Sequence, residues 1–512
     1  MMKEVWQRNS ALLKLAGIIG ILLFAFWVGM DPHWDYEYPL HVDEWFHIGY
    51  SDAMLHEGSL TYADPYSGGE ITKYHEMGFH LLLGSLAIST ETSLMELYRV
   101  APGIIFTLLA LLVYALGREK GYGWSAALCV PLIPTSIRTL GPAFLVPVAV
   151  AILFIPVVLL LLHKLENKNV WEFFVLVVIV VIAAVTVHAP TGFLIIAMVM
   201  AYFAVFVVKQ FLGRRFGMAI AVLVSLGVLM AVLLMLVDRW QPVLLRDTME
   251  LSITGDSGIS QYLGLHHGFI QAFGGVGTGL FVLGTFLYAL KRPYGLSSYV
   301  VPCFAVFLLL FLYVLYPRHD LGPSVLYERG WPLLGLLMAI LAGYAVACWF
   351  YLILPFIVNK VESIRLRSGI VFVVVSAAGV GMLTVTIFTG LVSQERDNYS
   401  GYYKMIDERV YNDFKWLGQN TIDGHKVVVM EPSLALAYPP IAGPLNRVAG
   451  AIAYPWRSAW ADKVHEMLVT GDVDVEWISD FNTSVLYTSG FTDVENNELI
   501  EVRPNIYIVT TK

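Results

Sequence analysis

Long apolar segments separated by short polar connections dominate the first 390 residues of the chain. An uncharged apolar run follows Lys14, and further runs of about 18–25 residues recur as far as Leu391. At 1.5 Å per residue, helices of this length can cross a hydrocarbon layer of ~30 Å. The pattern therefore predicts a polytopic α-helical membrane protein.

We predict about eleven transmembrane helices from these runs. Their approximate bounds are residues 12–30, 101–117, 123–137, 142–162, 171–188, 190–208, 216–237, 269–290, 299–316, 331–357 and 369–391. The run Met77 to Ser89 is also apolar, but its roughly 13 residues are too few to span a bilayer. We expect an interfacial or re-entrant helix there.

Positive charge is distributed unequally between the two sets of connections. One set carries 15 Lys and Arg residues, including the N-terminal Lys3, Arg8 and Lys14, whereas the opposite set carries seven up to residue 391. Cytoplasmic loops are enriched in Lys and Arg. We therefore expect a multi-pass protein of the cell membrane with a cytoplasmic N-terminus. With an odd number of spans, the C-terminal tail lies outside the cytoplasm.

The composition changes after Ser393 to a mixture of charged and polar residues, with 17 Asp and Glu against 10 Lys and Arg. Hydrophobic periodicity predicts helices near 404–419 and 460–469, and strands near 426–430, 484–488 and 499–510. We expect two domains. Residues 1–392 form a transmembrane catalytic module that includes the first extracytoplasmic loop, 31–100, and residues 393–512 form a small extracytoplasmic α/β domain.

Overall composition agrees with this picture, since 57% of the residues are apolar and 14% are charged, against about 45–50% and 25% in soluble proteins. The net charge of −8 argues against nucleic acid as a partner. All three cysteines lie inside apolar runs, so no disulfide framework is indicated.

Candidate chemistry is concentrated in the first loop. Residues 31–76 contain ten carboxylates and five histidines, with Lys73 as the only Lys or Arg. Apolar spacing predicts a membrane-surface helix over 42–58 that ends at Gly58. Asp43, Glu44 and His47 lie within its first turns, so the two acids could supply a general base beside the membrane. The alternative is a solvated acidic loop whose first-turn acids interact with the helix dipole.

The same loop could also hold a divalent metal, such as Mg²⁺, Mn²⁺ or Zn²⁺. Glu44 with His47, and His75 with Glu76 and His80, form two short groups of histidine and carboxylate ligands. These side chains could equally contact an acceptor. No metal-binding motif of fixed spacing supports the site, so we commit to no metal.

Three cations or potential cations occupy connections on the same predicted side as this loop. They are Arg138 in PTSIRTLGP, His188 in HAPTG and Arg329 in YERGWP. Each could anchor a helix end at the membrane surface. Together with the acidic loop they fit transfer from a phosphate-bearing donor, because arginine binds phosphate in a bidentate manner.

This pattern resembles the GT-C-type multi-spanning glycosyltransferases that use polyprenyl-phosphate-linked sugars. The similar segments are VDEWFHIGYSDAML (42–55), DPYSGGEITKYHEMGFHLLLGSLA (64–87), IRTLGPAFLVPVAVAILF (137–154), HAPTGFLIIA (188–197), ERGWPLLGLLMAILAGYA (328–345) and the tail segments WLGQNT and KVVVME. The segments 137–154, 188–197 and 328–345 and the tail segments are similar to stretches of archaeal members. The WWDxG signature of oligosaccharyltransferase subunits is missing, which favours transfer of a monosaccharide.

The resemblance implies inverting transfer from a polyprenyl (dolichyl) phosphate sugar to a glycan, lipid or protein acceptor. It implies Asp43 as general base, Glu44 as its partner and Arg329 as donor-phosphate ligand, with Arg138 and His188 assigned by position alone. A lipid-linked saccharide flippase or transporter is one alternative, although mid-span charges are nearly absent. A membrane metal-dependent hydrolase that uses the loop histidines is another.

Overall fold

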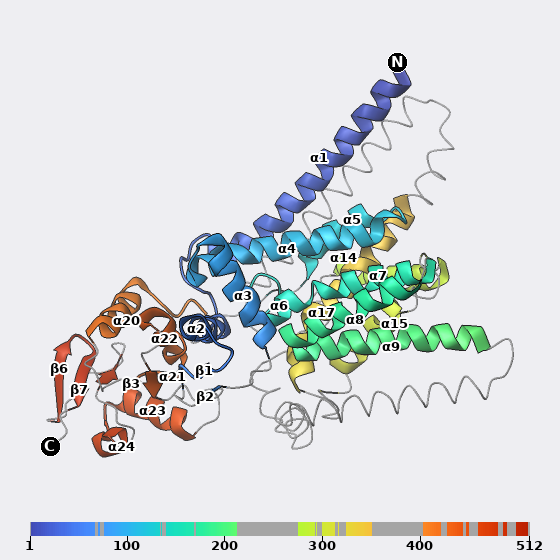
Figure 1. Ribbon diagram of the computed structural model, residues 1–512. Coiled ribbons are helices and arrows are strands. Elements are labelled where there is room, and N and C mark those ends of the chain that lie inside the picture. Colours follow the sequence, from blue (N-terminus) through green and yellow to red (C-terminus); the bar gives the residue numbers. More distant parts are fainter. Residues whose placement is uncertain are drawn as a thin grey trace. The chain divides into compact units, whose positions relative to one another are not determined.

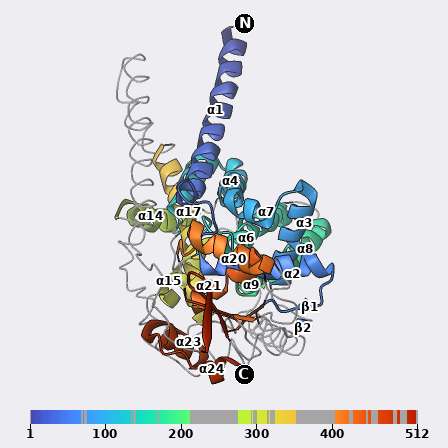
Figure 2. The same cartoon turned by 90° about the vertical axis from the view of Figure 1, so that its left-hand side faces the viewer.

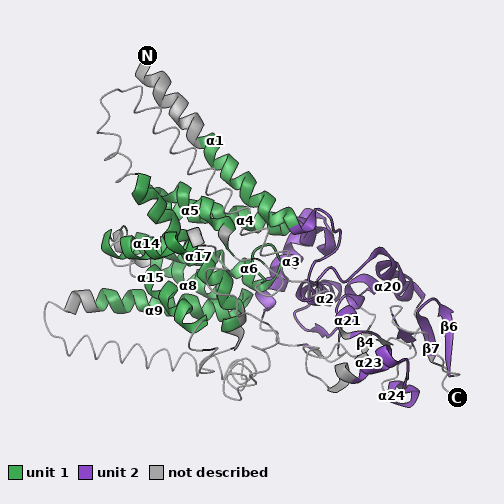
Figure 3. Cartoon of the chain, turned by 180° about the vertical axis from the view of Figure 1, so that it is seen from behind, with its two compact units in different colours: residues 1–31, 101–397 green, residues 32–100, 398–512 purple. Residues whose placement is uncertain are grey.

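The computed structural model describes two compact units of the chain (Figure 1, Figure 3). Unit 1 contains residues 1–31 and 101–397, and unit 2 contains residues 32–100 and 398–512. The residues described within them are 2–66, 70–71, 76–133, 135, 140–167, 170–211, 275–291, 293, 300–312, 316, 324–350, 403–420, 427–443, 447–449, 459–479, 485–488 and 498–509.

Unit 1 is built from apolar helices. They are α1 (Met2–Met30), the later part of α4 (Leu94–Arg118), α5 (Gly123–Cys129), the 3-10 helix η2 (Val130–Leu132), α6 (Pro147–Ala151), α7 (Phe154–Asn167), α8 (Val170–Val187), α9 (Ala189–Phe211), α14 (Gly275–Lys291), α15 (Val300–Leu310) and α17 (Ser324–Cys348). Their outward faces expose large apolar side chains such as Leu23, Ile182 and Phe286. Apolar surface of this kind is typical of helices that contact lipid.

Among the described residues, five helical segments are long and apolar enough to cross a membrane. They are Leu15–His33, Leu94–Arg118, Pro147–Leu165, Ala189–Val207 and Arg329–Cys348. Glu172–Val187, Gly277–Lys291 and Val300–Leu310 are shorter apolar helices at predicted spans. The predicted spans 216–237 and 369–391 lie outside the described residues, so the number of about eleven remains a prediction.

Two predicted spans differ in their details. Residues 123–132 form α5, of 7 residues, and η2, of 3 residues. The α-helix ends before Pro131, which has no backbone N–H to donate. The span expected from residue 142 begins instead at Pro147, and Ile152 and Leu153 separate α6 from α7. Proline therefore sets helix boundaries that the hydrophobic runs do not mark.

Helix α17 occupies the core of unit 1, and an 18-residue apolar window within Arg329–Cys348 is entirely buried. It packs against α14 on one side and α5 on another. Glycines allow both approaches: a Cβ on Gly284 of α14 would meet the backbone of Leu341, and a Cβ on Gly343 would meet the backbone of Ala126. Close packing through small residues is a common way to associate helices in membranes.

In unit 2 the first loop forms α2 (Val42–Glu57), the short strands β1 (Tyr62–Ala63) and β2 (Glu70–Ile71), and α3 (Met77–Thr90). The predicted helix over 42–58 is confirmed, with Gly58 as a left-handed C-cap at φ 61°. Ten of its 16 residues are buried, including Glu44 and His47, and its position on the membrane surface stays a prediction. Helix α3 buries one face and exposes Leu81, Leu86 and Ile88 on another.

The tail contributes helices around a five-stranded sheet. The helices are α20 (Glu408–Asn420), α21 (Pro432–Ala435), α22 (Tyr438–Ala442), α23 (Ala459–Thr470) and α24 (Val475–Ser479). The strands are β3 (Val427–Val429), β4 (Arg447–Ala449), β5 (Val485–Tyr487), β6 (Leu499–Arg503) and β7 (Ile506–Val509). Their order is β4-β3-β5-β7-β6, in which β3 is parallel to β4 and β5, and the remaining pairs are antiparallel.

The first loop and the tail pack together within unit 2, and the tail lies alongside α2 in both Figure 1 and Figure 2. The Tyr36 hydroxyl donates to the Ile406 carbonyl at 2.7 Å and accepts from the Ile406 N–H at 3.0 Å. The Lys404 N–H donates to the Leu40 carbonyl at 2.8 Å. The structure thus groups the loop with the tail, whereas the predicted domains place it in the module 1–392.

Candidate active site

The candidate site is organised by the N-terminus of α2. His41 is the N-cap residue, and its Nδ1 accepts the backbone N–H of Asp43 at 3.1 Å. The Glu44 carboxylate accepts the N–H groups of Leu40 at 2.7 Å and His41 at 3.1 Å. This reciprocal arrangement is a capping box with histidine in the place usually taken by serine or threonine.

Glu44 and Asp43 are adjacent in sequence but have different surroundings. Glu44 is fully buried and its Oε2 atom caps the helix. The Asp43 side chain retains 20% exposure and lies 3.8 Å from His41 Nδ1. Of the two predicted acids, Asp43 is therefore the one whose carboxylate is partly exposed. Glu44 thus has a structural role as a helix cap. Its catalytic role stays a prediction.

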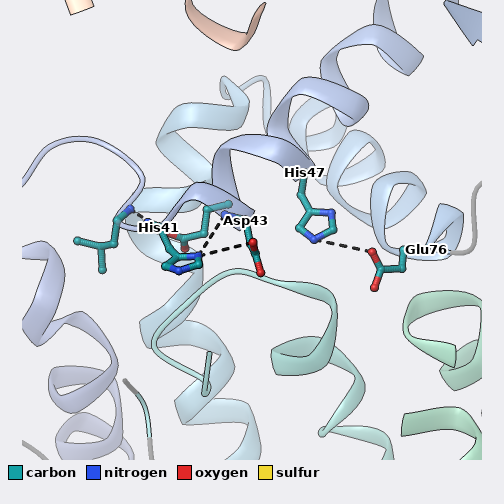
Figure 4. Close-up of polar contacts among 6 residues, drawn as sticks. His41, Asp43, His47 and Glu76 are labelled. Carbon is teal, nitrogen blue, oxygen red and sulfur yellow. Dashed lines mark hydrogen bonds and ion pairs between the residues drawn. The ribbon is translucent and has the colours of Figure 1, made fainter. Parts of the chain in front are cut away.

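Three polar side chains beside α2 are linked to one another: His47 of α2 contacts both His80 and Glu76. The His47 Nδ1 atom lies 3.1 Å from Nε2 of His80, and His47 Nε2 lies 3.8 Å from Glu76 Oε2. In Figure 4 the side chains of Asp43 and His47 leave the same side of α2, and Glu76 lies opposite His47. The rings of Phe79 and Tyr50 pack on the two histidines. The structure therefore brings together four of the predicted loop residues on or beside one helix face.

The metal site weighed as an alternative does not appear as a cluster in the described part of the first loop. No group of three or more His, Cys, Asp or Glu side chains within the described residues is placed to hold a metal ion. His47 and His80 share a hydrogen bond, which occupies one nitrogen of each ring. His75 lies outside the described residues, so the full predicted set is not tested.

Two tyrosines that we did not predict hold α2 in place. Tyr66 is buried, and its hydroxyl lies 3.1 Å from the Leu436 carbonyl and 3.3 Å from the Trp45 carbonyl. Burial raises its pKa well above the usual value. Gly49 leaves the space that this hydroxyl fills, since a Cβ there would meet it. The second tyrosine is Tyr36, just before α2, whose hydroxyl forms hydrogen bonds with the backbone of Ile406. Neither contact has a sequence signal, because the partners are backbone groups 370 residues away.

The predicted cations belong to unit 1. His188 is buried in the turn between α8 and α9, where its Nδ1 accepts the Thr191 N–H at 3.3 Å and lies 2.8 Å from the Thr191 hydroxyl. In the neutral ring this leaves the proton on Nε2. Arg329 lies within α17 and is partly buried. Arg138 lies outside the described residues.

Comparison with solved structures identifies the architecture. Archaeal oligosaccharyltransferase AglB from Archaeoglobus fulgidus, solved with an inhibitory peptide and a dolichol-phosphate, matches with a TM-score of 0.60 and 12% identity, over 92% of this chain and 69% of that chain. ArnT from Cupriavidus metallidurans, solved with undecaprenyl phosphate, matches with a TM-score of 0.54 and 14% identity, over 97% of both chains. The chain has the GT-C fold.

Other comparisons are consistent with a distant relationship. Arabinofuranosyltransferase AftD from mycobacteria matches with a TM-score of 0.51 and 14% identity, over 92% of this chain and 36% of that chain. No family model and no curated protein matches the sequence. The predicted GT-C architecture is thus confirmed at the level of the fold.

Proposed function

We propose that the chain is a membrane glycosyltransferase that moves a sugar from a polyprenyl-phosphate donor to an acceptor outside the cytoplasm. The observation that carries the proposal is Asp43, a partly exposed carboxylate at the start of a buried helix, in a chain with the GT-C fold. Two similar proteins were solved with polyprenyl phosphates bound, which supports a donor of this class. We further propose that the N-terminus is cytoplasmic and that the tail is not.

The proposed reaction is a single inverting displacement. An acceptor hydroxyl gives its proton to Asp43 while its oxygen attacks the anomeric carbon. The bond from that carbon to the phosphate oxygen breaks, and polyprenyl phosphate leaves with the electron pair. The capping box, through Glu44, keeps the first turn of α2 in place during this step.

The departing phosphate needs positive charge more than a proton donor. We assign Arg329 as its principal ligand, because a guanidinium can bind two phosphate oxygens at once. We propose His188 and Arg138 as further phosphate ligands. With Nδ1 of His188 engaged by Thr191, the Nε2–H group would be the donor.

The test uses the purified full chain in lipid nanodiscs with radiolabelled dolichyl-phosphate mannose and glucose, and with a membrane extract as the acceptor source. Release of dolichyl phosphate is measured, because it is common to every acceptor. Asp43→Asn should lose roughly 10²–10⁴-fold in rate while it still binds donor. Asp52→Asn, on the same helix, removes the same charge and should keep the wild-type rate.

Equal rates for Asp43→Asn and the wild type would overturn the assignment of the base. Transfer of intact labelled donor between the leaflets of vesicles, without cleavage, would identify a flippase instead. The same assay with EDTA tests the alternative in which the first loop holds a divalent metal. A loss of rate that Mg²⁺, Mn²⁺ or Zn²⁺ restores would support it, and an unchanged rate would refute it.

A further inference from the structure

Unit 2 carries a group of tyrosines near the candidate base that the proposed mechanism does not use. Two segments far apart in sequence supply Tyr36 and Tyr38 on one side and Tyr403 and Tyr411 on the other. The rings of Tyr38 and Tyr411 stack with centroids 5.0 Å apart, and Tyr36 meets Tyr38 edge-on at 5.6 Å. All four side chains are partly exposed. We call these four residues the tyrosine surface.

Polar groups on this surface are available to a ligand. The hydroxyls of Tyr38 and Tyr411 form no hydrogen bond with the described residues, and neither do the exposed carboxylates of Glu37 and Glu408. The Tyr36 hydroxyl, in contrast, is engaged by Ile406. The surface thus offers two phenol groups and two carboxylates, next to aromatic rings.

The surrounding charge is negative. Glu37, Asp407 and Glu408 all lie close enough to Tyr38 to raise the pKa of its hydroxyl, although burial has the larger effect. The nearby Lys404 is already paired with Asp35 at 2.7 Å. A phosphate or another polyanion would be repelled here.

The remaining choice is between a neutral sugar chain and a cationic peptide. An ammonium group can only donate hydrogen bonds, and that of Lys404 already lies 5.6 Å from the centroids of the Tyr36 and Tyr403 rings. A sugar hydroxyl both donates and accepts, and can satisfy carboxylates and phenols together. The apolar faces of sugar rings also match partly exposed aromatic rings. The mixture of donors, acceptors and rings therefore favours a neutral saccharide.

The position along the chain connects this surface to the reaction. Tyr38 precedes Asp43 by five residues, which span at most roughly 17 Å when fully extended. We propose that the tyrosine surface binds sugar units of the acceptor, and that the acceptor is a neutral glycan. This inference rests on the proposed transferase function, to which it adds the class of acceptor.

The experiment measures saccharide binding without any donor, by ligand-observed NMR on the full chain in nanodiscs. The probes are maltohexaose, cellohexaose, mannohexaose, galactohexaose and chitohexaose, with hexalysine as the cationic probe. We expect binding of at least one saccharide. Tyr38→Ala and Tyr411→Ala should each weaken it roughly ten-fold, as is typical of aromatic anchors, and Tyr38→Phe should weaken it less because the ring remains.

Trp477→Ala is the matched control, since this partly exposed ring on α24 contacts Lys463 instead. It should bind saccharide like the wild type. Because binding is measured without any donor, loss of binding and loss of transfer are separate readouts. Failure of all five saccharides to bind would overturn the proposal. So would equal weakening in Trp477→Ala and Tyr38→Ala, or binding of hexalysine alone.

Discussion

Two aspartates of the first loop have opposite electrostatic environments. Burial raises the pKa of Asp52 above its ordinary value, and the nearby His56 offsets this only in part. The hydrogen bond from Lys404 lowers the pKa of Asp35. At neutral pH, ionisation of Asp52 therefore opposes folding, whereas ionisation of Asp35 favours it.

We predict that Asp52→Asn raises the melting temperature at pH 7. The folded state binds the Asp52 proton more tightly than the unfolded state, so the cost of ionisation is present at neutral pH. It disappears as the pH falls below about 4. The increase in melting temperature caused by Asp52→Asn should therefore become smaller towards pH 4. Thermal unfolding of the detergent-solubilised protein measures it. Asp35→Asn should have a small effect of opposite sign at pH 7, because its carboxylate is exposed. A gain for Asp52→Asn that does not depend on pH would contradict this account.

At the scale of elements, close contacts at glycines determine how α17 fits into unit 1. Gly343 lies against the backbone of Ala126 in α5, and neither backbone can move away cheaply. Ser125 adds a hydrogen bond from its hydroxyl to the Gly343 carbonyl at 2.6 Å. The α5–α17 contact thus depends on the absence of a single methyl group.

Gly343→Ala should destabilise the protein by about 1–3 kcal/mol, because the new methyl group overpacks the contact. Gly279→Ala in α14 is the matched control, since its Cβ would meet nothing within 4 Å. Thermal unfolding of both variants in the same detergent checks the difference. If the two variants melt together, α5 and α17 do not pack as closely as described.

Element ends were predictable where a local signal marks them. Gly58 predicts the end of α2, and Asp407, whose side chain accepts the Val410 N–H at 2.7 Å, explains why α20 begins at Glu408 rather than 404. The strand predicted over 499–510 is instead the hairpin β6–β7, with Asn505 in the left-handed region at φ 67°. Strand β4 was missed, because three residues that pair with β3 carry little pattern of their own.

The candidate site was predictable in composition but not in arrangement. The sequence placed Asp43, Glu44 and His47 within two turns of one helix, which periodicity alone supports. It could not tell that Glu44 turns back to cap the helix while Asp43 does not. It also could not reveal His47 facing His80, because that contact depends on how α2 and α3 pack.

At the scale of the whole molecule, the predicted topology places the tail outside the cytoplasm. After the three native cysteines are replaced by serine, Lys415→Cys in exposed α20 should react with a membrane-impermeant maleimide in intact cells. Lys120→Cys, which follows α4, should react only after lysis. The reverse pattern would invert the topology, and with it the side on which transfer is proposed to occur.

The contacts of Tyr36 with Ile406 have a consequence for biogenesis. They join groups 370 residues apart in sequence, and chains are synthesised at about 5–20 residues per second. The first loop must therefore wait roughly 20–70 seconds after its own synthesis before the segment that completes it emerges. During that interval Tyr36 lacks its backbone partner, while the helices of unit 1 that follow residue 101 are synthesised. A chain cut before Ile406 would therefore lack the backbone contacts that hold Tyr36, seven residues before Asp43.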